Sequence, residues 1–117
     1  MHDRLKRAPG IYLTGFMGCG KSEVGRLLAG EIGWDFVDLD EEIARAAGMP
    51  IAEIFPQHGE PAFRALERAA ILEQTGEARR GRARVVALGG GAFADERNRE
   101  ALASAGLTIW LDVPLAQ

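Results

Sequence analysis

The strongest chemical signal in the sequence is a glycine-rich segment that ends in lysine and serine. Residues 15–22 read Gly-Phe-Met-Gly-Cys-Gly-Lys-Ser and match the pattern G-x-x-x-x-G-K-[ST] at every fixed position. Glycines let consecutive backbone N–H groups surround a phosphate, and the positive end of the following helix adds to the attraction. In such a loop the lysine reaches the β- and γ-phosphates, and the serine hydroxyl is available to Mg²⁺. We therefore predict a nucleotide site formed by Gly18, Cys19, Gly20, Lys21, Ser22 and Glu23.

Two acidic residues follow the next apolar segment. Asp38 and Asp40 flank Leu39, so in a strand their side chains leave the same face. Ligands of open α/β sheets bind at the carboxyl ends of the strands, where this pair would lie. We expect one of these carboxylates to bind Mg²⁺ and the other to orient or deprotonate an acceptor hydroxyl. The alternative is that one of the two acids only caps the helix that follows.

Two further features concern the acceptor. Arg64 precedes Glu67 by three residues in a helical pattern. This spacing fits an exposed ion pair without function, or a guanidinium that Glu67 holds for bidentate binding of a substrate carboxylate. The three glycines Gly89, Gly90 and Gly91 exceed the need of a tight turn and indicate close approach of the backbone to another group. No aspartate ends the preceding strand, which leaves metal binding to Asp38 and Ser22.

Short apolar segments alternate with helical patterns and must position these residues. We predict strands at 11–13, 36–39, 85–88 and 107–111, helices at 21–32, 40–48, 60–75 and 95–105, and one or two helical turns at 51–55. The helices place apolar residues, Leu27 and Leu72 among them, at core spacing. Residues 76–84 are expected to form a connecting segment exposed to solvent, with its arginine side chains in water. Uninterrupted apolar strands between helices predict a three-layer α/β fold, with a parallel sheet of about four strands and helices on both faces.

Length and composition exclude several classes of protein. The 117 residues suit a single domain over 1–117, and a net charge of −3 gives no general attraction to nucleic acid or an anionic membrane. No apolar segment is long enough to span a bilayer. The single cysteine, Cys19, suits a reducing, cytoplasmic setting and reads as a spacer, not a nucleophile. We expect a monomer with small-molecule partners.

Taken together, these residues resemble the shikimate kinase family, which has a P-loop kinase fold. The matching stretches are residues 15–22 with Val24-Gly25, Phe36 to Asp40, Ile54-Phe55, His58 to Glu60, Phe63-Arg64 with Glu67, Gly89 to Gly91, and Trp110-Leu111. The resemblance implies Mg²⁺-dependent phosphoryl transfer from ATP to the 3-hydroxyl of shikimate. It implies that Lys21 and Asp40 are catalytic, that Asp40, Arg64 and Gly90 bind shikimate, and that Ser22 and Asp38 bind the metal.

The same resemblance concerns the end of the chain. Members of the family continue past the position of Gln117 with an arginine-bearing lid and a final strand. We therefore expect a sheet that lacks its last strand, no lid, and impaired turnover in the 117-residue chain. Two alternatives stay open: another small-molecule kinase, such as one that acts on gluconate, and a catalytically dead nucleotide-binding module.

Overall fold

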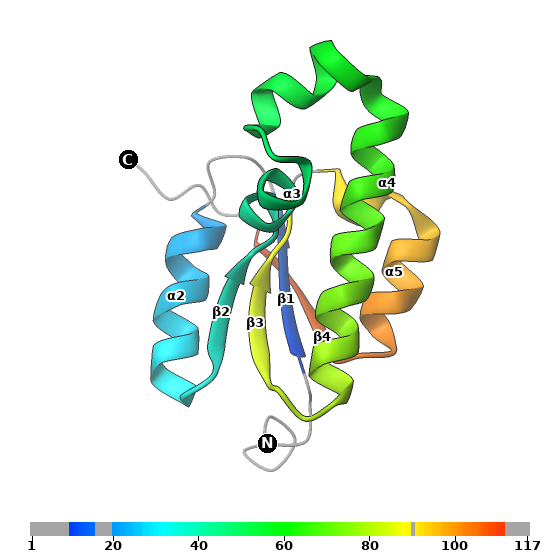
Figure 1. The fold of residues 1–117 in the computed structure, drawn as a ribbon. Coiled ribbons are helices and arrows are strands. Elements are labelled where there is room, and N and C mark those ends of the chain that lie inside the picture. The colour runs from blue at the N-terminus through cyan, green and yellow to red at the C-terminus, as the bar shows by residue number, and fades with distance from the viewer. Residues whose placement is uncertain (1–9, 16–19, 90, 112–117) are drawn as a thin grey trace.

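Four parallel strands form one sheet with helices on both of its faces (Figure 1). The structure is a computed structural model and describes residues 10–15, 20–89 and 91–111. Its elements are β1 (Gly10–Gly15), α2 (Lys21–Ile32), β2 (Asp35–Asp38), α3 (Leu39–Ala47), α4 (Ile51–Arg79), β3 (Arg84–Ala87), the 3₁₀ turn η1 (Ala92–Ala94), α5 (Glu96–Ala103) and β4 (Leu107–Leu111). The strand order is β2-β3-β1-β4, so β1 lies inside the sheet. The predicted three-layer α/β fold is confirmed.

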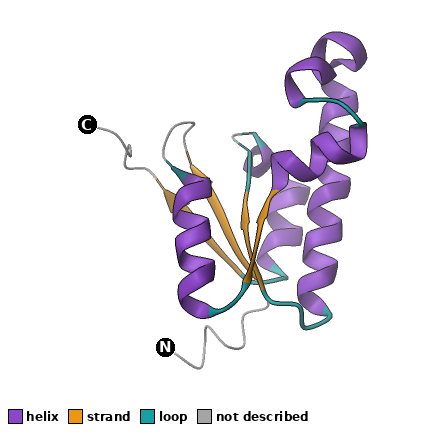
Figure 2. Cartoon of the chain, turned by 60° about the vertical axis from the view of Figure 1, so that its left-hand side comes forward, coloured by secondary structure: helices purple, strands orange, loops and turns teal. Residues whose placement is uncertain are grey.

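The alternation of side chains along the strands builds two separate cores. Ile11 and Leu13 of β1 pack with Val85 of β3 beneath α2. Tyr12 and Val86, which point to the other face, pack against α3, α4 and α5. Figure 2 shows these layers, with α2 on one side of the strands and the other helices on the opposite side. Both faces of the central strands are therefore buried, as their continuous apolar character predicted.

The register of the sheet aligns the strand ends that carry functional residues. Asp38, at the end of β2, pairs with Ala87 of β3, and Ala87 pairs with Leu13 of β1. Gly15, at the end of β1, pairs with Leu111 of β4. Because all the strands are parallel, the segments that follow them gather at one edge of the sheet.

The long helix α4 contains the break that the sequence predicted. The expected helical turns at 51–55 and the expected helix at 60–75 are joined, but Gly59 between them has φ 84° and ψ 167°, which no helix adopts. A glycine tolerates this conformation, and the neighbouring Pro56 and Pro61 disfavour a continuous helix. The axis therefore changes direction here, and the N-terminal part of α4 extends away from the sheet (Figure 1).

Several expectations about elements and burial were wrong. Leu39 begins α3 instead of ending β2, because the side chain of Asp38 caps the helix from the preceding position. Leu27 and Leu72 are 73% and 46% exposed, because each lies on the outer face of its helix. Residues 76–84 are not a free connection, since α4 continues to Arg79.

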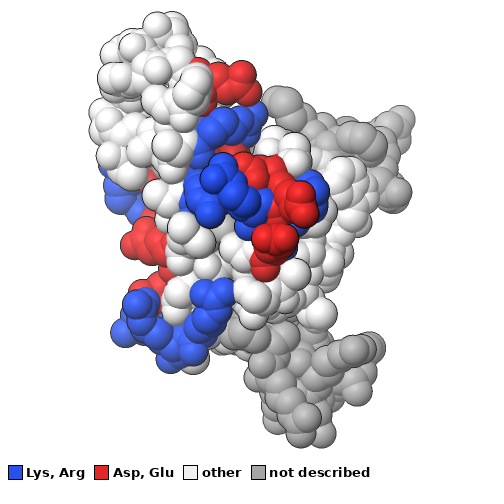
Figure 3. Space-filling model, turned by 90° about the vertical axis from the view of Figure 1, so that its right-hand side faces the viewer, with Lys and Arg blue, Asp and Glu red and all other residues white. Residues whose placement is uncertain are grey.

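The arginine run near the end of α4 is only partly solvated. Arg80 and Arg82 are exposed and pair with Glu77. Arg84 is buried, and its Nη1 donates to Oε1 of Gln74 at 2.6 Å, so its place in a solvated run was wrong. Basic and acidic side chains are interspersed over this face (Figure 3). Among the helices that the structure describes, none is both long and apolar enough to cross a membrane.

Candidate functional site

The start of α2 supplies the described part of the phosphate loop. Gly20 caps the helix with φ 82° and ψ 28°, a left-handed conformation that glycine adopts readily. The Nζ atom of Lys21, the first helical residue, donates to the carbonyl of Gly15 at 3.2 Å. The ammonium therefore lies next to the carboxyl end of β1. Gly18 and Cys19, which were predicted to bind nucleotide, lie outside the described residues, and Glu23 is exposed in the first turn of α2.

Ser22 and Asp38 meet at the edge of the sheet. The hydroxyl of Ser22 donates to Oδ2 of Asp38 at 3.0 Å. The other carboxylate oxygen of Asp38 accepts from the backbone N–H groups of Asp40 and Glu41, at 3.0 and 3.4 Å, and so caps α3. The capping alternative is therefore correct for Asp38, and the same carboxylate also contacts Ser22. Capping of α3 fixes the orientation of the Asp38 carboxylate. One of its oxygens is therefore held next to the hydroxyl of Ser22.

Asp40 belongs to the first turn of α3, so the strand geometry expected for it was wrong. Its side chain remains open to solvent at the cavity wall, yet the surrounding protein removes part of its hydration. This burial raises the pKa of Asp40, the charge of Asp38 raises it further, and the charge of Lys21 opposes the rise. The carboxylate of Asp40 therefore lies close enough to Asp38 and Lys21 to interact with both charges.

Arg64 and Glu67 form the ion pair that their spacing predicted. The Nη1 atom of Arg64 donates to both carboxylate oxygens of Glu67, at 2.9 and 3.2 Å. Glu60 adds a longer contact of 3.5 Å to Nε. The side chain of Glu67 is only 2% exposed, whereas that of Arg64 is 40% exposed. A buried carboxylate therefore holds an accessible guanidinium, which separates this pair from an ordinary surface pair.

The electrostatics of this pair follow from its burial. Burial raises the pKa of Glu67, and the hydrogen bond and charge of Arg64 oppose that rise. The hydrogen bond to Glu67 raises the pKa of Arg64, which stays charged. The side of the guanidinium that does not face Glu67 is therefore a fixed cation for an anionic ligand.

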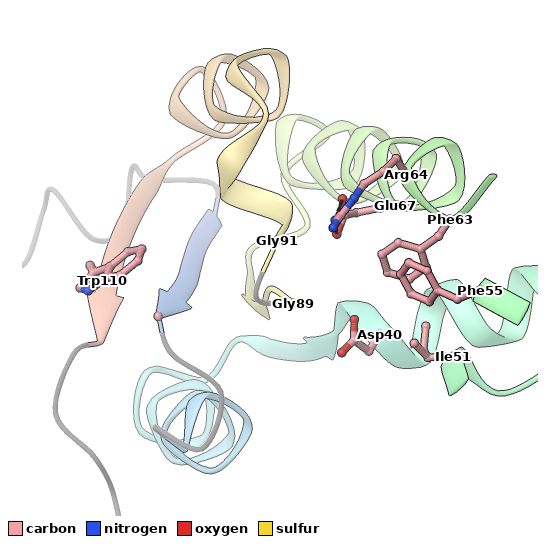
Figure 4. Close-up of a pocket in the computed structure, with 10 residues that line it drawn as sticks. Asp40, Ile51, Phe55, Phe63, Arg64, Glu67, Gly89, Gly91 and Trp110 are labelled. Carbon is pink, nitrogen blue, oxygen red and sulfur yellow. Dashed lines mark hydrogen bonds and ion pairs between the residues drawn. The ribbon is translucent and has the colours of Figure 1, made fainter. Parts of the chain in front are cut away.

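One cavity of about 660 Å³ brings these groups together (Figure 4). It is lined by Gly15, Asp40, Ile51, Phe55, Phe63, Arg64, Glu67, Gly89, Gly91 and Trp110. The rings of Phe55 and Phe63 lie with their centroids 4.7 Å apart and form an apolar wall. The volume suits a small organic molecule. The cavity therefore combines an acid, a held guanidinium and an apolar wall next to the end of β1.

Sequence reasoning assigned no function to part of this lining. Ile51 was read only as part of a helical turn, and Phe55 and Trp110 only as helix and strand residues within family stretches. The position of Trp110 near the carboxyl end of the last strand was a usable signal, because that end of a parallel sheet carries the site. The sequence carried no such signal for Phe55, since it predicted a break before residue 60 but not the direction in which the preceding helical turns point. Gly90 lies outside the described residues.

The donor set at the sheet edge fits a magnesium ion bound together with phosphates. Within the described ranges, no cluster of three or more histidine, cysteine or acidic side chains could hold a metal by itself. Mg²⁺ usually keeps several waters and binds through one or two protein oxygens plus substrate phosphates. The Ser22 hydroxyl and the Asp38 carboxylate supply that number of oxygens.

Comparison with known sequences finds similarity to shikimate kinases. A family model described as shikimate kinase matches residues 17–117. Shikimate kinase from Novosphingobium aromaticivorans is 47% identical over 112 residues, which cover 94% of this chain and 58% of the relative. Shikimate kinase from Geobacter sulfurreducens is 50% identical over 105 residues, which cover 90% of this chain and 56% of the relative.

Comparison with solved structures agrees. Shikimate kinase from Acinetobacter baumannii in complex with shikimate matches with a TM-score of 0.85 and 40% identity, over 97% of this chain and 62% of that one. Shikimate kinase from Aquifex aeolicus matches with a TM-score of 0.82 and 37% identity, over 91% and 61%. The chain thus spans about three fifths of the length of the relatives it matches.

Proposed function

Because the chain belongs to the shikimate kinase family, we propose that the protein transfers the γ-phosphoryl group of ATP to the 3-hydroxyl of shikimate. One observation carries this proposal. A single cavity joins Gly15, where the phosphate loop begins, to Asp40 and to the guanidinium of Arg64. An enzyme that transfers a phosphoryl group from a nucleotide to an anionic acceptor needs this combination. A protein that only binds a nucleotide has no need of the acceptor side.

The acceptor side suits a small, hydroxylated carboxylic acid. The guanidinium of Arg64, held by Glu67, would bind the carboxylate, and the faces of Phe55 and Phe63 would cover the carbon ring. Asp40 would contact the hydroxyls, and Gly90 would add a backbone contact. The similar enzyme from Acinetobacter baumannii is in complex with shikimate, and that likeness supports the choice of acceptor.

The nucleotide side would hold ATP and a magnesium ion. Residues Gly18 to Glu23 would surround the phosphates, with Lys21 next to the phosphoryl group in transfer. The Ser22 hydroxyl and the Asp38 carboxylate would hold Mg²⁺, which supplies charge neutralisation at the phosphates when bound. ATP is formed and used in the cytoplasm, where we propose that the protein works.

The chemical step would be an in-line displacement at the γ-phosphorus. Asp40 accepts the proton of the acceptor hydroxyl, whose oxygen forms the new bond to phosphorus. The bond from the γ-phosphorus to the bridging oxygen breaks, and ADP leaves with that electron pair. The raised pKa of Asp40 makes it a stronger base than an ordinary aspartate, provided that it is ionised.

An acceptor panel tests this function. The protein expressed from its own gene is given ATP and Mg²⁺, and ADP release is followed with shikimate, with gluconate and without an acceptor. We expect release that depends on shikimate, and for the 117-residue chain by itself a rate below the ~1–100 s⁻¹ that is normal for kinases. Release that depends on gluconate alone would favour the sugar-acid alternative.

Two further results would separate the remaining readings. ATP binding by calorimetry without turnover on either acceptor would favour a catalytically dead nucleotide-binding module. ³¹P NMR of the product tests the position of the phosphate on shikimate. Light scattering of the same preparation checks the expectation of a monomer.

A further inference from the structure

Two glycines pack against the two charged residues of the acceptor side. A Cβ atom built on Gly91 would lie 2.6 Å from Nη1, 2.7 Å from Nη2 and 3.0 Å from Cζ of Arg64. A Cβ atom built on Gly89 would lie 2.8 Å from Oδ1 of Asp40. All these separations are closer than van der Waals contact between such atoms. The backbone after β3 therefore lies directly against the guanidinium and the carboxylate.

The backbone conformation does not explain why these residues are glycines. Gly91 has φ −98° and ψ −4°, which any residue can adopt. Gly89 also has a negative φ, in contrast to glycines such as Gly33 and Gly48, whose φ values are 74° and 73°. At positions 89 and 91 the missing Cβ thus serves close approach, not an unusual turn.

An added Cβ would move the functional groups more readily than it would unfold the protein. The atoms in conflict are the far ends of the Arg64 and Asp40 side chains, which can rotate away, and not backbone atoms. The guanidinium of Arg64 is accessible to solvent on one side, so space exists for it to move. Its movement would break the contacts of 2.9 and 3.2 Å to Glu67 that aim it into the cavity.

We propose, on the basis of the function proposed above, that Gly91 and Gly89 are positioning residues: Gly91 sets the guanidinium of Arg64 for the acceptor carboxylate, and Gly89 sets the carboxylate of Asp40 for the acceptor hydroxyl. The two glycines act on different groups. Gly91 therefore affects acceptor binding, and Gly89 affects the chemical step.

Alanine substitutions test this division. Gly91→Ala should raise the KM for shikimate ~10–100-fold, since a displacement of about 1 Å costs up to 10²-fold, and should leave the KM for ATP within about twofold. Gly89→Ala should lower kcat by a similar factor with little change in either KM. Gly30→Ala is the matched control, because Gly30 lies in α2 with nothing within 4 Å of an added Cβ. It should leave every constant unchanged.

A double-mutant cycle distinguishes positioning from general damage. If Gly91 acts through Arg64, then Gly91→Ala should add less than about twofold to the loss in kcat/KM already caused by Arg64→Ala. The same holds for Gly89→Ala in an Asp40→Asn background. Additive losses would overturn the proposal. If Gly91→Ala alone unfolds the protein, restored stability in the Arg64→Ala background supports the proposal, and no restoration overturns it.

A crystal structure of the Gly91→Ala protein shows the position of the Arg64 guanidinium without a measurement of activity. We expect the guanidinium to have left Glu67, and an unchanged Arg64–Glu67 contact overturns the inference. This outcome is separate from the proposed function. A wild-type protein that fails to use shikimate refutes the proposed reaction, whereas an active wild type with indistinguishable glycine variants refutes only the positioning.

Discussion

Asp40 illustrates how the environment of one carboxyl group would set its chemistry. Burial and the charge of Asp38 raise the pKa of Asp40 above its ordinary 3.8. The basic form is therefore lost at a higher pH than for a free aspartate, and kcat should fall as the pH decreases through the raised value. Asp40→Asn should lower kcat ~10²–10⁴-fold, as expected for loss of a general base, and remove this inflection. The pH–rate profile of both proteins measures it.

The neighbouring acid Glu41 provides the control for that experiment. It is exposed in the same helical turn, and its backbone N–H, not its side chain, contacts Asp38. Glu41→Gln should therefore keep both the rate and the inflection. An Asp40→Asn protein with normal kcat would exclude the role of base.

The held guanidinium leads to a second prediction at this scale. Arg64→Ala should raise the KM for shikimate ~10–100-fold, since a charge-assisted hydrogen bond contributes about 1.5–3 kcal/mol, and should leave the KM for ATP nearly unchanged. Arg45→Ala is a matched control, because Arg45 forms a comparable i, i+3 pair with Glu42 at 2.6 Å that is exposed. Steady-state kinetics with each substrate varied measures both variants. Equal losses for ATP and shikimate would contradict a carboxylate-binding role.

At the scale of elements, the sequence predicted where helices and strands occur better than it predicted which face of each helix is buried. The strands and the order of helices followed from apolar runs and glycine breaks. Leu27 and Leu72 were placed inside because spacing alone does not fix which apolar residue of a helix faces the sheet. Leu39 was placed on the second strand, whereas the carboxylate of Asp38 caps α3 and β2 ends one residue earlier than predicted. Capping and helix rotation are tertiary effects that a residue pattern records poorly.

Close packing of α2 on the sheet gives a prediction for Gly25. A Cβ atom at this position would lie 2.4 Å from Cε1 of Phe36 and 3.3 Å from Cδ1 of Leu13. Gly25→Ala should therefore destabilise the protein by ~1–3 kcal/mol through overpacking, although alanine is the better helix former. Urea unfolding measures the change, with Gly30→Ala in the same helix expected to be neutral or stabilising. A stabilised Gly25→Ala protein would show that α2 can move away from β2 at little cost.

At the scale of the whole molecule, the functional residues lie at the carboxyl ends of the strands. Their positions depend on the two hydrophobic cores, which pack against the two faces of the sheet. The two cores hold β1 and β3 in register, and this register places Asp38 next to the phosphate side. The sequence predicted this arrangement because parallel strands must end together. It did not predict the cavity wall, since the direction of the helical turns before Gly59, which bring Phe55 to the cavity, is not recorded in the residue pattern.

The core beneath α4 and α5 can be followed by one titration, because Tyr12 is the only tyrosine of the chain. Its hydroxyl is fully buried and donates to the carbonyl of Ala105 at 3.4 Å. Burial raises the pKa of Tyr12 to about 12, from an ordinary 10.0. The folded state therefore holds this proton more tightly than the unfolded state. Stability is fully present below pH 10.0 and should decrease by roughly 2–3 kcal/mol as the pH rises to about 12.

Two measurements check this dependence together. Absorbance at the tyrosinate band should show ionisation well above pH 10.0, and it should coincide with loss of helical circular dichroism if ionisation requires unfolding. Tyr12→Phe removes the titrating group while keeping the ring, so its unfolding free energy should change less between pH 10.0 and about 12. Ionisation of Tyr12 near its ordinary pKa in the folded protein would mean that water reaches its hydroxyl beside Ala105. That result would contradict the burial of the Tyr12 side chain between β1 and the segment that follows α5.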